Sequence, residues 1–236
     1  MTKTYDHRYF QHWYRDQAIH DPKRLARKVA LAVAVTEHYL ERPLRSVLDI
    51  GCGEGAWRAP LLKLRPKLRY LGFDSSEYAI ARHGVRRNLH PARFGDFAWL
   101  RPCAPVDLLV CADVLHYLPS RELLAGLPGL AELCSGVAFL ETFSAEDEFE
   151  GDTEGFQPRK AAWYRRRLQA EGFRRQRPQG GEPVFVLAVE ILARVAFAAR
   201  RDAHAAERGD PLVDHARHRL IGGVPFAIAA AEHRVA

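Results

Sequence analysis

The stretch "VLDIGCGEG" at positions 47–55 places three glycines at alternate positions directly after a short apolar run. Glycine has no side chain to bury and loses more conformational freedom on folding than any other residue. Three glycines after a strand-like segment therefore indicate a turn whose backbone approaches a ligand closely. Asp49 stands at their head. The stretch favours a parallel strand, a ligand-binding loop and the N-terminus of a helix, in that order.

Strand-like and helix-like segments alternate along the chain on both sides of this turn. Strands are expected at 46–51, 69–74, 92–96, 106–113, 136–143 and 183–192, and helices at 21–40, 56–66, 76–87, 120–134 and 160–173. The segment 106–113 is continuously apolar, as in a strand that is buried on both faces. Such alternation predicts an α/β fold of the Rossmann-like type, with about seven mostly parallel strands and helices on both faces of the sheet.

Three regions follow from the composition along the chain. Residues 1–40 form an aromatic N-terminal cap and a helix, which begins with Asp21 as N-cap and Pro22 at the first helical position. Residues 41–193 form the ligand-binding domain. Residues 194–236 are rich in alanine and arginine, and they are expected to be an extension whose role the sequence does not indicate.

Composition excludes several classes of protein. The chain has 236 residues, 47% of them hydrophobic, and no apolar run is long enough to cross a bilayer. The charged, aromatic N-terminus does not resemble a secretory signal, so a cytoplasmic protein is expected. The four cysteines, at positions 52, 103, 111 and 134, lack metal-binding spacing, and no metal is expected.

A net charge of +6 suggests nucleic acid as a partner. However, arginines account for most of the 35 basic residues and are spread along the chain, with one dense patch at 163–177. A solvated helix face is the simpler interpretation of that patch. A nucleic-acid partner is therefore not expected.

Two classes of ligand use such a glycine turn. A dinucleotide would use the pattern G-x-G-x-x-G/A, which Gly51, Gly53 and Ala56 match loosely, with Asp74 following. The stretch also resembles motif I of the class I S-adenosylmethionine (SAM)-dependent methyltransferases, D/E-x-G-x-G-x-G, in which the acid precedes the glycines. A carboxylate at Asp49 suits the cationic methionine head of SAM.

Three later segments, "YLGFD", "RFGDF" and "DLLVCADVLHYLP", resemble further motifs of that family in the expected order. The resemblance covers about 41–192 and implies that Asp74 accepts the ribose hydroxyls and Asp96 the adenine amine. It also implies an antiparallel last strand, and S-adenosyl-L-homocysteine as the product of S-adenosyl-L-methionine. The implied cofactor-binding residues are Asp49, Gly51, Cys52, Gly53, Asp74, Ser75, Asp96, Phe97 and Ala112.

The resemblance also places His116 and Tyr117 beside the transferred methyl group. Histidine suits the removal of a proton from an acceptor near neutral pH, so His116 is the first candidate for a catalytic base. Tyr117 would shape the site. Glu141, at the end of a strand, is the second candidate base.

A small molecule is the expected methyl acceptor, at an O, N or C nucleophile. Seven acids in the loop 141–154 could attract a cationic acceptor, or they could pair with the arginines at 165–167. RNA or protein acceptors, a NAD-dependent oxidoreductase and an inactive cofactor-binding domain remain alternatives. The sequence leaves open whether the protein forms a homodimer, and no membrane partner is expected.

Overall fold

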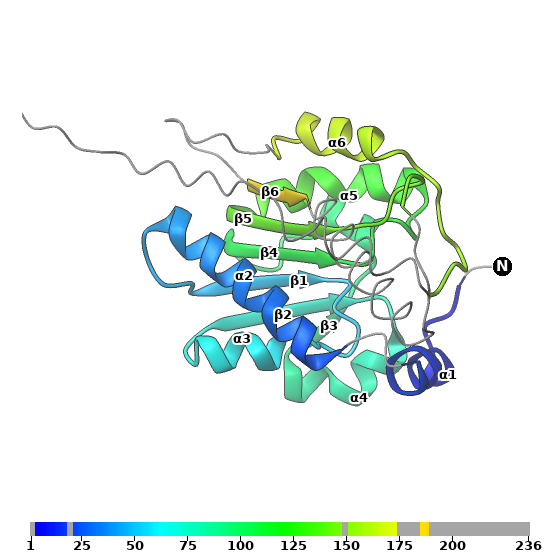
Figure 1. Ribbon diagram of the computed structural model, residues 1–236, viewed down its shortest axis with the longest axis horizontal. Helices are drawn as coiled ribbons and strands as arrows, with labels where there is room; N and C mark the ends of the chain where they lie inside the picture. The colour runs from blue at the N-terminus through cyan, green and yellow to red at the C-terminus, as the bar shows by residue number, and fades with distance from the viewer. Residues whose placement is uncertain (1–2, 18–20, 148–150, 174–184, 189–236) are drawn as a thin grey trace, which may run out of the picture. The chain divides into compact units, whose positions relative to one another are not determined.

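The computed structural model describes residues 3–17, 21–147, 151–173 and 185–188. Its centre is a sheet whose six described strands lie in the order β3-β2-β1-β4-β5-β6 (Figure 1). The strands are β1 (Ser46–Ile50), β2 (Arg69–Asp74), β3 (Leu89–Pro91), β4 (Val106–Ala112), β5 (Cys134–Glu141) and β6 (Phe185–Ala188). Every neighbouring pair is parallel.

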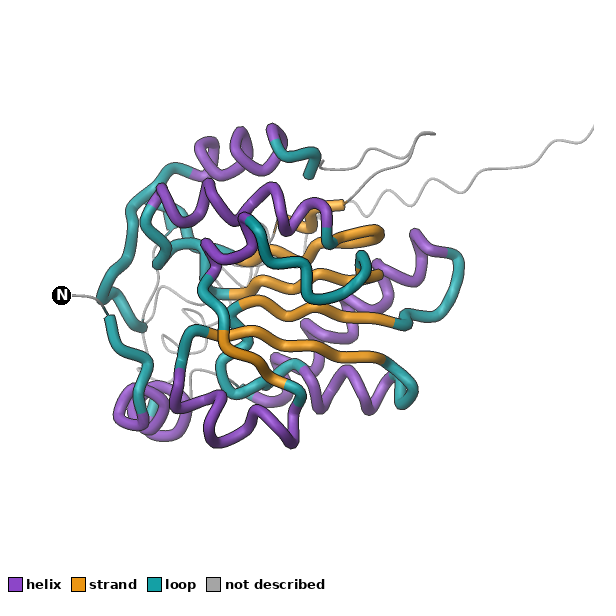
Figure 2. Tube along the Cα trace, turned by 180° about the vertical axis from the view of Figure 1, so that it is seen from behind, coloured by secondary structure: helices purple, strands orange, loops and turns teal. Residues whose placement is uncertain are grey.

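Helices cover both faces of this sheet (Figures 1 and 2). They are α1 (His7–Phe10), the π-helix η1 (Gln11–Asp16), α2 (Pro22–Leu40), α3 (Arg58–Leu64), α4 (Glu77–Arg87), the 3-10 helix η2 (Phe94–Ala98), α5 (Ser120–Glu132) and α6 (Ala161–Ala170). Side chains of α2 and α3 pack with one face of the central strands. Those of η2, α5 and α6 pack with the other face. The α/β architecture predicted from the alternating segments is thereby confirmed.

Local sequence explains where the main elements begin. All five residues of β1 are buried, as expected for a central strand with helices on both sides. The Asp21 side chain accepts a hydrogen bond from the Lys23 N–H at 2.9 Å, and Pro22 is the first residue of α2, as predicted. Ser76 caps α4 in the same way, through the Ala79 N–H at 3.1 Å.

Two predictions about strands are wrong. The segment 92–96 is not a strand: β3 ends at Pro91, and η2 follows because the Asp96 carboxylate accepts the Arg93 N–H at 2.8 Å and tightens the turn. The last described strand, β6, is parallel to β5 and not antiparallel. The helix α6 lies between them in sequence, and a helical crossover returns the chain in the same direction. The described residues contain six strands, and no seventh is among them.

Because the strands are parallel, their carboxyl ends meet at one edge of the sheet. The N-terminal segment, with α1 and η1, lies beyond this edge (Figure 1). The chain between β5 and α6 runs on the same side of the sheet, toward the N-terminal segment. Within the described part of the chain, no helix is long and apolar enough to cross a membrane. The predicted extension at 194–236 lies outside the described residues, so its prediction is not tested.

Candidate functional site

The glycine loop after β1 requires glycine for both its backbone and its space. Gly51 and Gly53 have φ angles of +70° and +53°, in the left-handed region that glycine adopts readily. A β-carbon on Gly51 would lie 2.2 Å from a methyl carbon of Val114, and one on Gly53 would lie 2.7 Å from the Tyr14 hydroxyl. Burial raises the pKa of the Cys52 thiol well above its ordinary value, so this thiol stays protonated and unreactive.

Two buried carboxylates flank this loop. The Tyr70 hydroxyl donates to Asp49 at 2.6 Å, and burial together with the charge of Asp74 raises the pKa of Asp49 to about 7. The Asp74 carboxylate accepts the Gly53 N–H at 2.7 Å and the Ser76 N–H at 2.8 Å, and burial raises its pKa too. The Ser75 N–H is a third donor to this carboxylate, so Asp74 holds the glycine loop to the end of β2 and keeps about one of its four lone pairs for a ligand.

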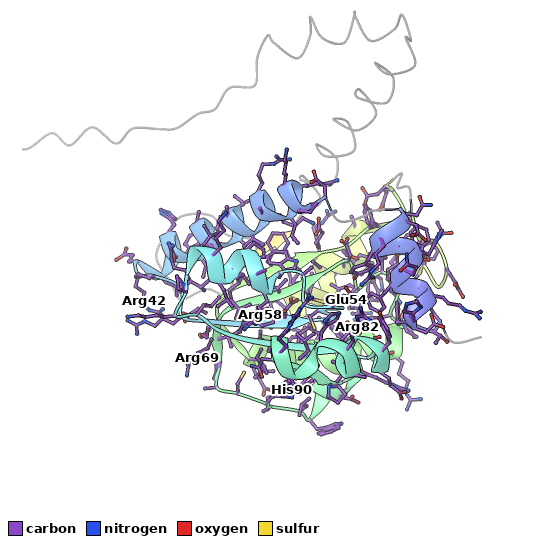
Figure 3. All side chains as sticks on the ribbon, turned by 90° about the horizontal axis from the view of Figure 1, so that it is seen from below. Arg42, Glu54, Arg58, Arg69, Arg82 and His90 are labelled. Carbon is purple, nitrogen blue, oxygen red and sulfur yellow. The ribbon has the colours of Figure 1, made fainter. Side chains whose placement is uncertain are left out.

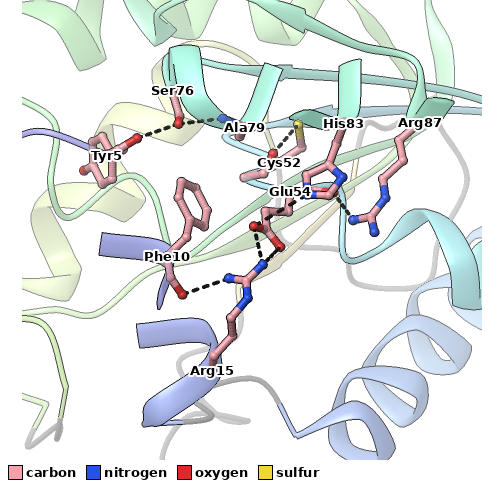
Figure 4. A network of polar contacts seen from close by, with 10 residues as sticks. Tyr5, Phe10, Arg15, Cys52, Glu54, Ser76, Ala79, His83 and Arg87 are labelled. Atoms are coloured by element: carbon pink, nitrogen blue, oxygen red, sulfur yellow. Dashed lines mark hydrogen bonds and ion pairs between the residues drawn. The ribbon is translucent and has the colours of Figure 1, made fainter. Parts of the chain in front are cut away.

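The N-terminal segment is fastened over the loop by polar contacts (Figure 4). Arg15 donates to both carboxylate oxygens of Glu54, at 2.8 and 3.1 Å, and to the Phe10 carbonyl at 3.0 Å. The Ser76 hydroxyl donates to the Tyr5 carbonyl at 2.6 Å. Sequence reasoning identified the aromatic segment as a cap but missed Arg15 and Glu54. An acid inside the glycine run, in "GEG", was the available signal.

Aromatic contacts complete this attachment. The Phe10 ring lies 4.8 Å from the Tyr14 ring and 5.5 Å from the Tyr78 ring of α4, measured between centroids. Burial raises the pKa of Tyr14 well above its ordinary value, and the charge of Asp74 contributes. Tyr14 therefore stays a neutral hydroxyl between the glycine loop and the carboxyl ends of the strands.

A second group of side chains surrounds the end of β4. Asp113 has a φ angle of +61°, and its N–H donates to the Glu141 carbonyl at 3.0 Å. Burial and the charge of Asp113 raise the pKa of Glu141 to about 7, although an ion pair with Lys28 of α2 opposes both effects. The negative charge of Asp113 also acts on His116 and Tyr117. Of the three residues predicted to be catalytic, His116 and Tyr117 are in contact, with 4.2 Å between their ring centroids, and Glu141 lies beside Asp113.

His116 is buried at the start of the turn after β4. Its Nδ1 atom lies 3.3 Å from the Thr142 hydroxyl and accepts the Phe143 N–H at 3.3 Å. Burial lowers the pKa of His116 to about 4, so the ring is neutral at pH 7. The Phe143 N–H assigns Nδ1 as the acceptor, and a neutral ring then carries its proton on Nε2. This arrangement favours a hydrogen-bond donor at His116 over a base.

The described acids of the 141–154 loop have partners within the domain. Glu146 accepts the Ala161 N–H at 2.9 Å, at the start of α6, and Asp147 accepts the Ser144 N–H at 2.8 Å. Asp152 forms a buried ion pair with Lys3 of the N-terminal segment. Glu146 and Asp147 therefore stabilise the loop itself, whereas Asp152 joins the loop to the N-terminal segment.

The residues at this edge of the sheet lie within a segment that matches a known protein family. Residues 48–136 match the model of a methyltransferase domain, and this range includes the glycine loop, Asp74 and the end of β4. These residues of the chain form a methyltransferase domain. The resemblance of the glycine loop to motif I implies S-adenosyl-L-methionine as the cofactor.

Sequence relatives of the methyltransferase domain include trans-aconitate 2-methyltransferases. The enzyme of Deinococcus radiodurans is 39% identical over 90 residues, which are 37% of this chain and 34% of that protein. The enzyme of Methylobacterium nodulans is 39% identical over 94 residues, which are 39% of this chain and 34% of that protein. This chain thus spans about a third of the length of these curated relatives.

Solved structures share the fold of the methyltransferase domain. A SAM-dependent methyltransferase from Archaeoglobus fulgidus matches with a TM-score of 0.54 at 16% identity, covering 81% of this chain and 90% of that one. DesVI of Streptomyces venezuelae matches with a TM-score of 0.51 at 18% identity, covering 68% of this chain and 87% of that one. At these identities the matches establish the architecture alone.

The residues at the carboxyl edge of the methyltransferase domain fit the cofactor. The glycine loop has no room for β-carbons, and the two buried carboxylates beside it suit a ligand with hydroxyl donors and a cationic head. Ser75 is exposed in the turn after Asp74, and Ala112 is half-buried at the end of β4. These six residues and Cys52 lie at or beside the carboxyl ends of β1, β2 and β4, and their contacts with a cofactor stay predictions.

Asp96 and Phe97 lie differently from the rest of the predicted cofactor residues. Asp96 is half-buried in η2, where its carboxylate caps the turn through the Arg93 N–H. The Phe97 side chain is fully buried and packs on Phe73 with 5.6 Å between ring centroids. Its carbonyl accepts the Arg101 guanidinium at 2.6 Å. The adenine contacts of these two residues stay predictions.

Several arginines of the methyltransferase domain serve the fold and not a ligand. Arg42 pairs with both oxygens of Asp107, at 2.8 and 2.9 Å, and the backbone N–H of Arg45 donates to the same carboxylate. In Figure 3, Arg42 and Arg69 lie at the end of the sheet away from Glu54. The positive charges of Arg42 and Arg69 are therefore remote from the glycine loop.

Proposed function

We propose that this protein transfers the methyl group of S-adenosyl-L-methionine to a nucleophile on a small molecule. The observation that carries the proposal is the gathering of the glycine loop, two buried carboxylates and a fastened N-terminal cap at the carboxyl edge of a methyltransferase domain. Relatives named trans-aconitate 2-methyltransferases support a small-molecule acceptor. Open parallel sheets bind ligands at this edge.

Seven of the nine predicted cofactor residues, all except Asp96 and Phe97, have a role that their positions support. Asp74 would accept from the ribose hydroxyls with the lone pair that its three backbone donors leave, and Asp49 would face the cationic methionine head. The backbone of Gly51, Cys52 and Gly53 would line the methionine, because no β-carbon fits at the two glycines. Ser75 and Ala112 would line the ribose and adenine side of the site.

The bound cofactor supplies an activated sulfonium methyl group. The residues of the chain must then position the acceptor, exclude water and take up the acceptor's proton. We assign the proton uptake to the Glu141 carboxylate, whose pKa of about 7 leaves it partly ionised at neutral pH. His116 would donate a hydrogen bond from Nε2 to the acceptor, and Tyr117 would form a wall of the site.

Substitutions separate these roles. Glu141→Gln should lower kcat by roughly tenfold to a thousandfold and remove the alkaline rise of kcat/KM near pH 7. His116→Gln, which keeps a donor, should affect KM more than kcat. Lys28→Met should shift the rise to higher pH, because Lys28 lowers the pKa of Glu141. Equal kcat values for Glu141→Gln and the wild type would exclude Glu141 as the base.

The overall activity is tested by the release of S-adenosyl-L-homocysteine. The purified chain would be incubated with S-adenosyl-L-methionine and, separately, with a polycarboxylic acid such as trans-aconitate, a primary alkylamine, a phenol, a structured RNA or a basic peptide. Turnover that requires a small molecule supports the proposal. Turnover with RNA or peptide alone would contradict it.

A macromolecular acceptor is the second candidate, and the exposed arginines of α6 favour it. Arg166 and Arg167 are exposed on this helix, and Arg167 stacks over the Trp163 ring at 5.7 Å. RNA binding would depend steeply on salt and disappear on Arg→Ala substitution there. Retained binding in those variants would exclude this surface.

A further inference from the structure

The Lys3 ammonium is enclosed by aromatic rings and oxygen acceptors. It lies 3.8 Å from the centroid of the Tyr117 ring and 5.3 Å from those of Tyr5 and Tyr9. It pairs with the Asp152 carboxylate, and it donates to the Glu154 carbonyl at 3.0 Å. The side chains of Lys3 and Asp152 are only 9% and 7% exposed. We call these surroundings of Lys3 the ammonium cage.

Two aromatic walls of the ammonium cage are held by contacts that do not involve Lys3. The Tyr5 carbonyl accepts the Ser76 hydroxyl at 2.6 Å, a contact drawn in Figure 4. The Tyr9 N–H donates to the Asp6 carboxylate at 3.0 Å, at the N-cap of α1. These walls can therefore keep their places when the Lys3 side chain leaves.

The acidic wall is ordered in the same way. The Tyr117 hydroxyl donates to the Asp152 carbonyl at 2.7 Å and fixes the loop against the ring. The Glu154 N–H donates to one carboxylate oxygen of Asp152 at 3.0 Å. The other oxygen, Oδ2, is left for the ammonium. A carboxylate aimed in this way at a space between aromatic faces has the chemistry that recognises alkylammonium groups.

The ammonium cage adjoins the proposed acceptor side of the site. Tyr117 forms one wall, and its ring centroid is 4.2 Å from that of His116. The charges of Asp113 and Asp152 both act on the titration of these two side chains. A group held in the cage is therefore a near neighbour of the residues to which we assign acceptor positioning.

We propose that the ammonium cage is the subsite for an alkylammonium group of the methyl acceptor, and that Lys3 is its internal occupant until such an acceptor displaces it. The proposal rests on the proposed function for the identity of the neighbouring site. The ammonium cage narrows the class of methyl acceptors to small molecules that carry an amine protonated at neutral pH.

Exchange of one ammonium for another explains how the subsite can be emptied and refilled. A buried carboxylate without a partner is costly, so Asp152 retains a cation in both states. The cation–aromatic contacts are likewise kept in the exchange. A carboxylate ligand in the same place would bring a like charge against Asp152 and would be rejected.

The test is a calorimetric titration of n-butylammonium into the full chain and its variants. Lys3→Ala should bind it in the millimolar range and about tenfold or more tightly than the wild type, where the Lys3 side chain competes. Asp152→Asn added to Lys3→Ala should weaken binding about tenfold, because the charge-assisted contact is lost. Lys23→Ala, at an exposed lysine of α2, is the matched control and should behave as the wild type.

Two results would overturn the proposal. One is equal n-butylammonium binding by Lys3→Ala and the wild type. The other is butyrate binding to Lys3→Ala as tightly as n-butylammonium. Lys3→Gln, with far-UV circular dichroism on every variant, provides a second folded protein for the same comparison. S-adenosyl-L-homocysteine is titrated in parallel: failure to bind it would contradict the proposed function, whereas the n-butylammonium result alone decides the cage.

Discussion

Replacing Asp49 with asparagine should change how the stability of this protein depends on pH. Burial raises the pKa of Asp49 from the ordinary 3.8 to about 7. Below the lower value both folded and unfolded chains are protonated. Between the two values the unfolded chain has lost the proton and the folded chain keeps it. The free energy of unfolding therefore falls as pH rises, by about 1.4 kcal/mol per unit and about 4 kcal/mol in total.

Urea unfolding of the wild type and Asp49→Asn at pH 5 and pH 8 measures this effect. Asparagine preserves an acceptor for the Tyr70 hydroxyl and nearly the same volume. The other titrating groups are present in both proteins, so their contributions largely cancel when the two free energies of unfolding are subtracted. The stability of the variant relative to the wild type should rise by about 3 kcal/mol from pH 5 to pH 8. A relative change under about 0.5 kcal/mol would refute the reasoning.

Asp107→Asn is the control, because the fold lowers the pKa of Asp107 and raises that of Asp49. Arg42 and backbone N–H groups lower the pKa of Asp107, so this carboxylate is ionised in both folded and unfolded chains from pH 5 upward. The variant should lose stability, because it breaks the pair with Arg42, but by nearly the same amount at both pH values. A relative change like that of Asp49→Asn would show that the pH effect is not specific to Asp49.

Three further predictions follow from the site. Asp74→Ala should weaken S-adenosyl-L-homocysteine binding more than tenfold by calorimetry, and unchanged affinity would remove Asp74 from the cofactor site. Gly51→Ala should lower the free energy of unfolding in urea by about 2 kcal/mol or more, because its β-carbon meets Val114 at positive φ, and a neutral effect would contradict the loop geometry. Arg15→Ala should speed tryptic cleavage after Arg8, a site that both proteins keep, since the contacts to Glu54 and Phe10 are lost; equal rates at Arg8 would show that Arg15 does not fasten the segment.

The central strands and their chemistry could be predicted because local pattern and tertiary context agree there. The apolar runs before Asp49 and Asp74 form β1 and β2 with the acids at their ends. The capping of α2 by Asp21 was equally local. In these places a residue's neighbours in sequence are also the neighbours that determine its structure.

Other features depend on distant residues and could not be predicted. The helix α5 contains Pro128, and Gly129 lies so close to the Phe97 carbonyl that a β-carbon would be 1.8 Å away. The direction of β6 depends on the crossover through α6. The pairing of Lys3 with Asp152 joins residues 149 positions apart, for which the sequence carries no pattern.

The preference for Glu141 over His116 as the proton acceptor also came from tertiary structure. Sequence reasoning favoured histidine for its ordinary pKa near neutrality. Burial moves the two pKa values in opposite directions, to about 4 for His116 and about 7 for Glu141. Residue type alone ranks His116 above Glu141 as a candidate base. The burial of both side chains favours the opposite ranking, because it brings the pKa of Glu141 closer to neutrality than that of His116.

The most direct test of the central claim is a calorimetric titration of the wild-type chain with S-adenosyl-L-homocysteine and, separately, with NADH. The glycine loop, Asp49 and Asp74 together predict micromolar binding of S-adenosyl-L-homocysteine and no binding of NADH. Binding of NADH without S-adenosyl-L-homocysteine would contradict the account.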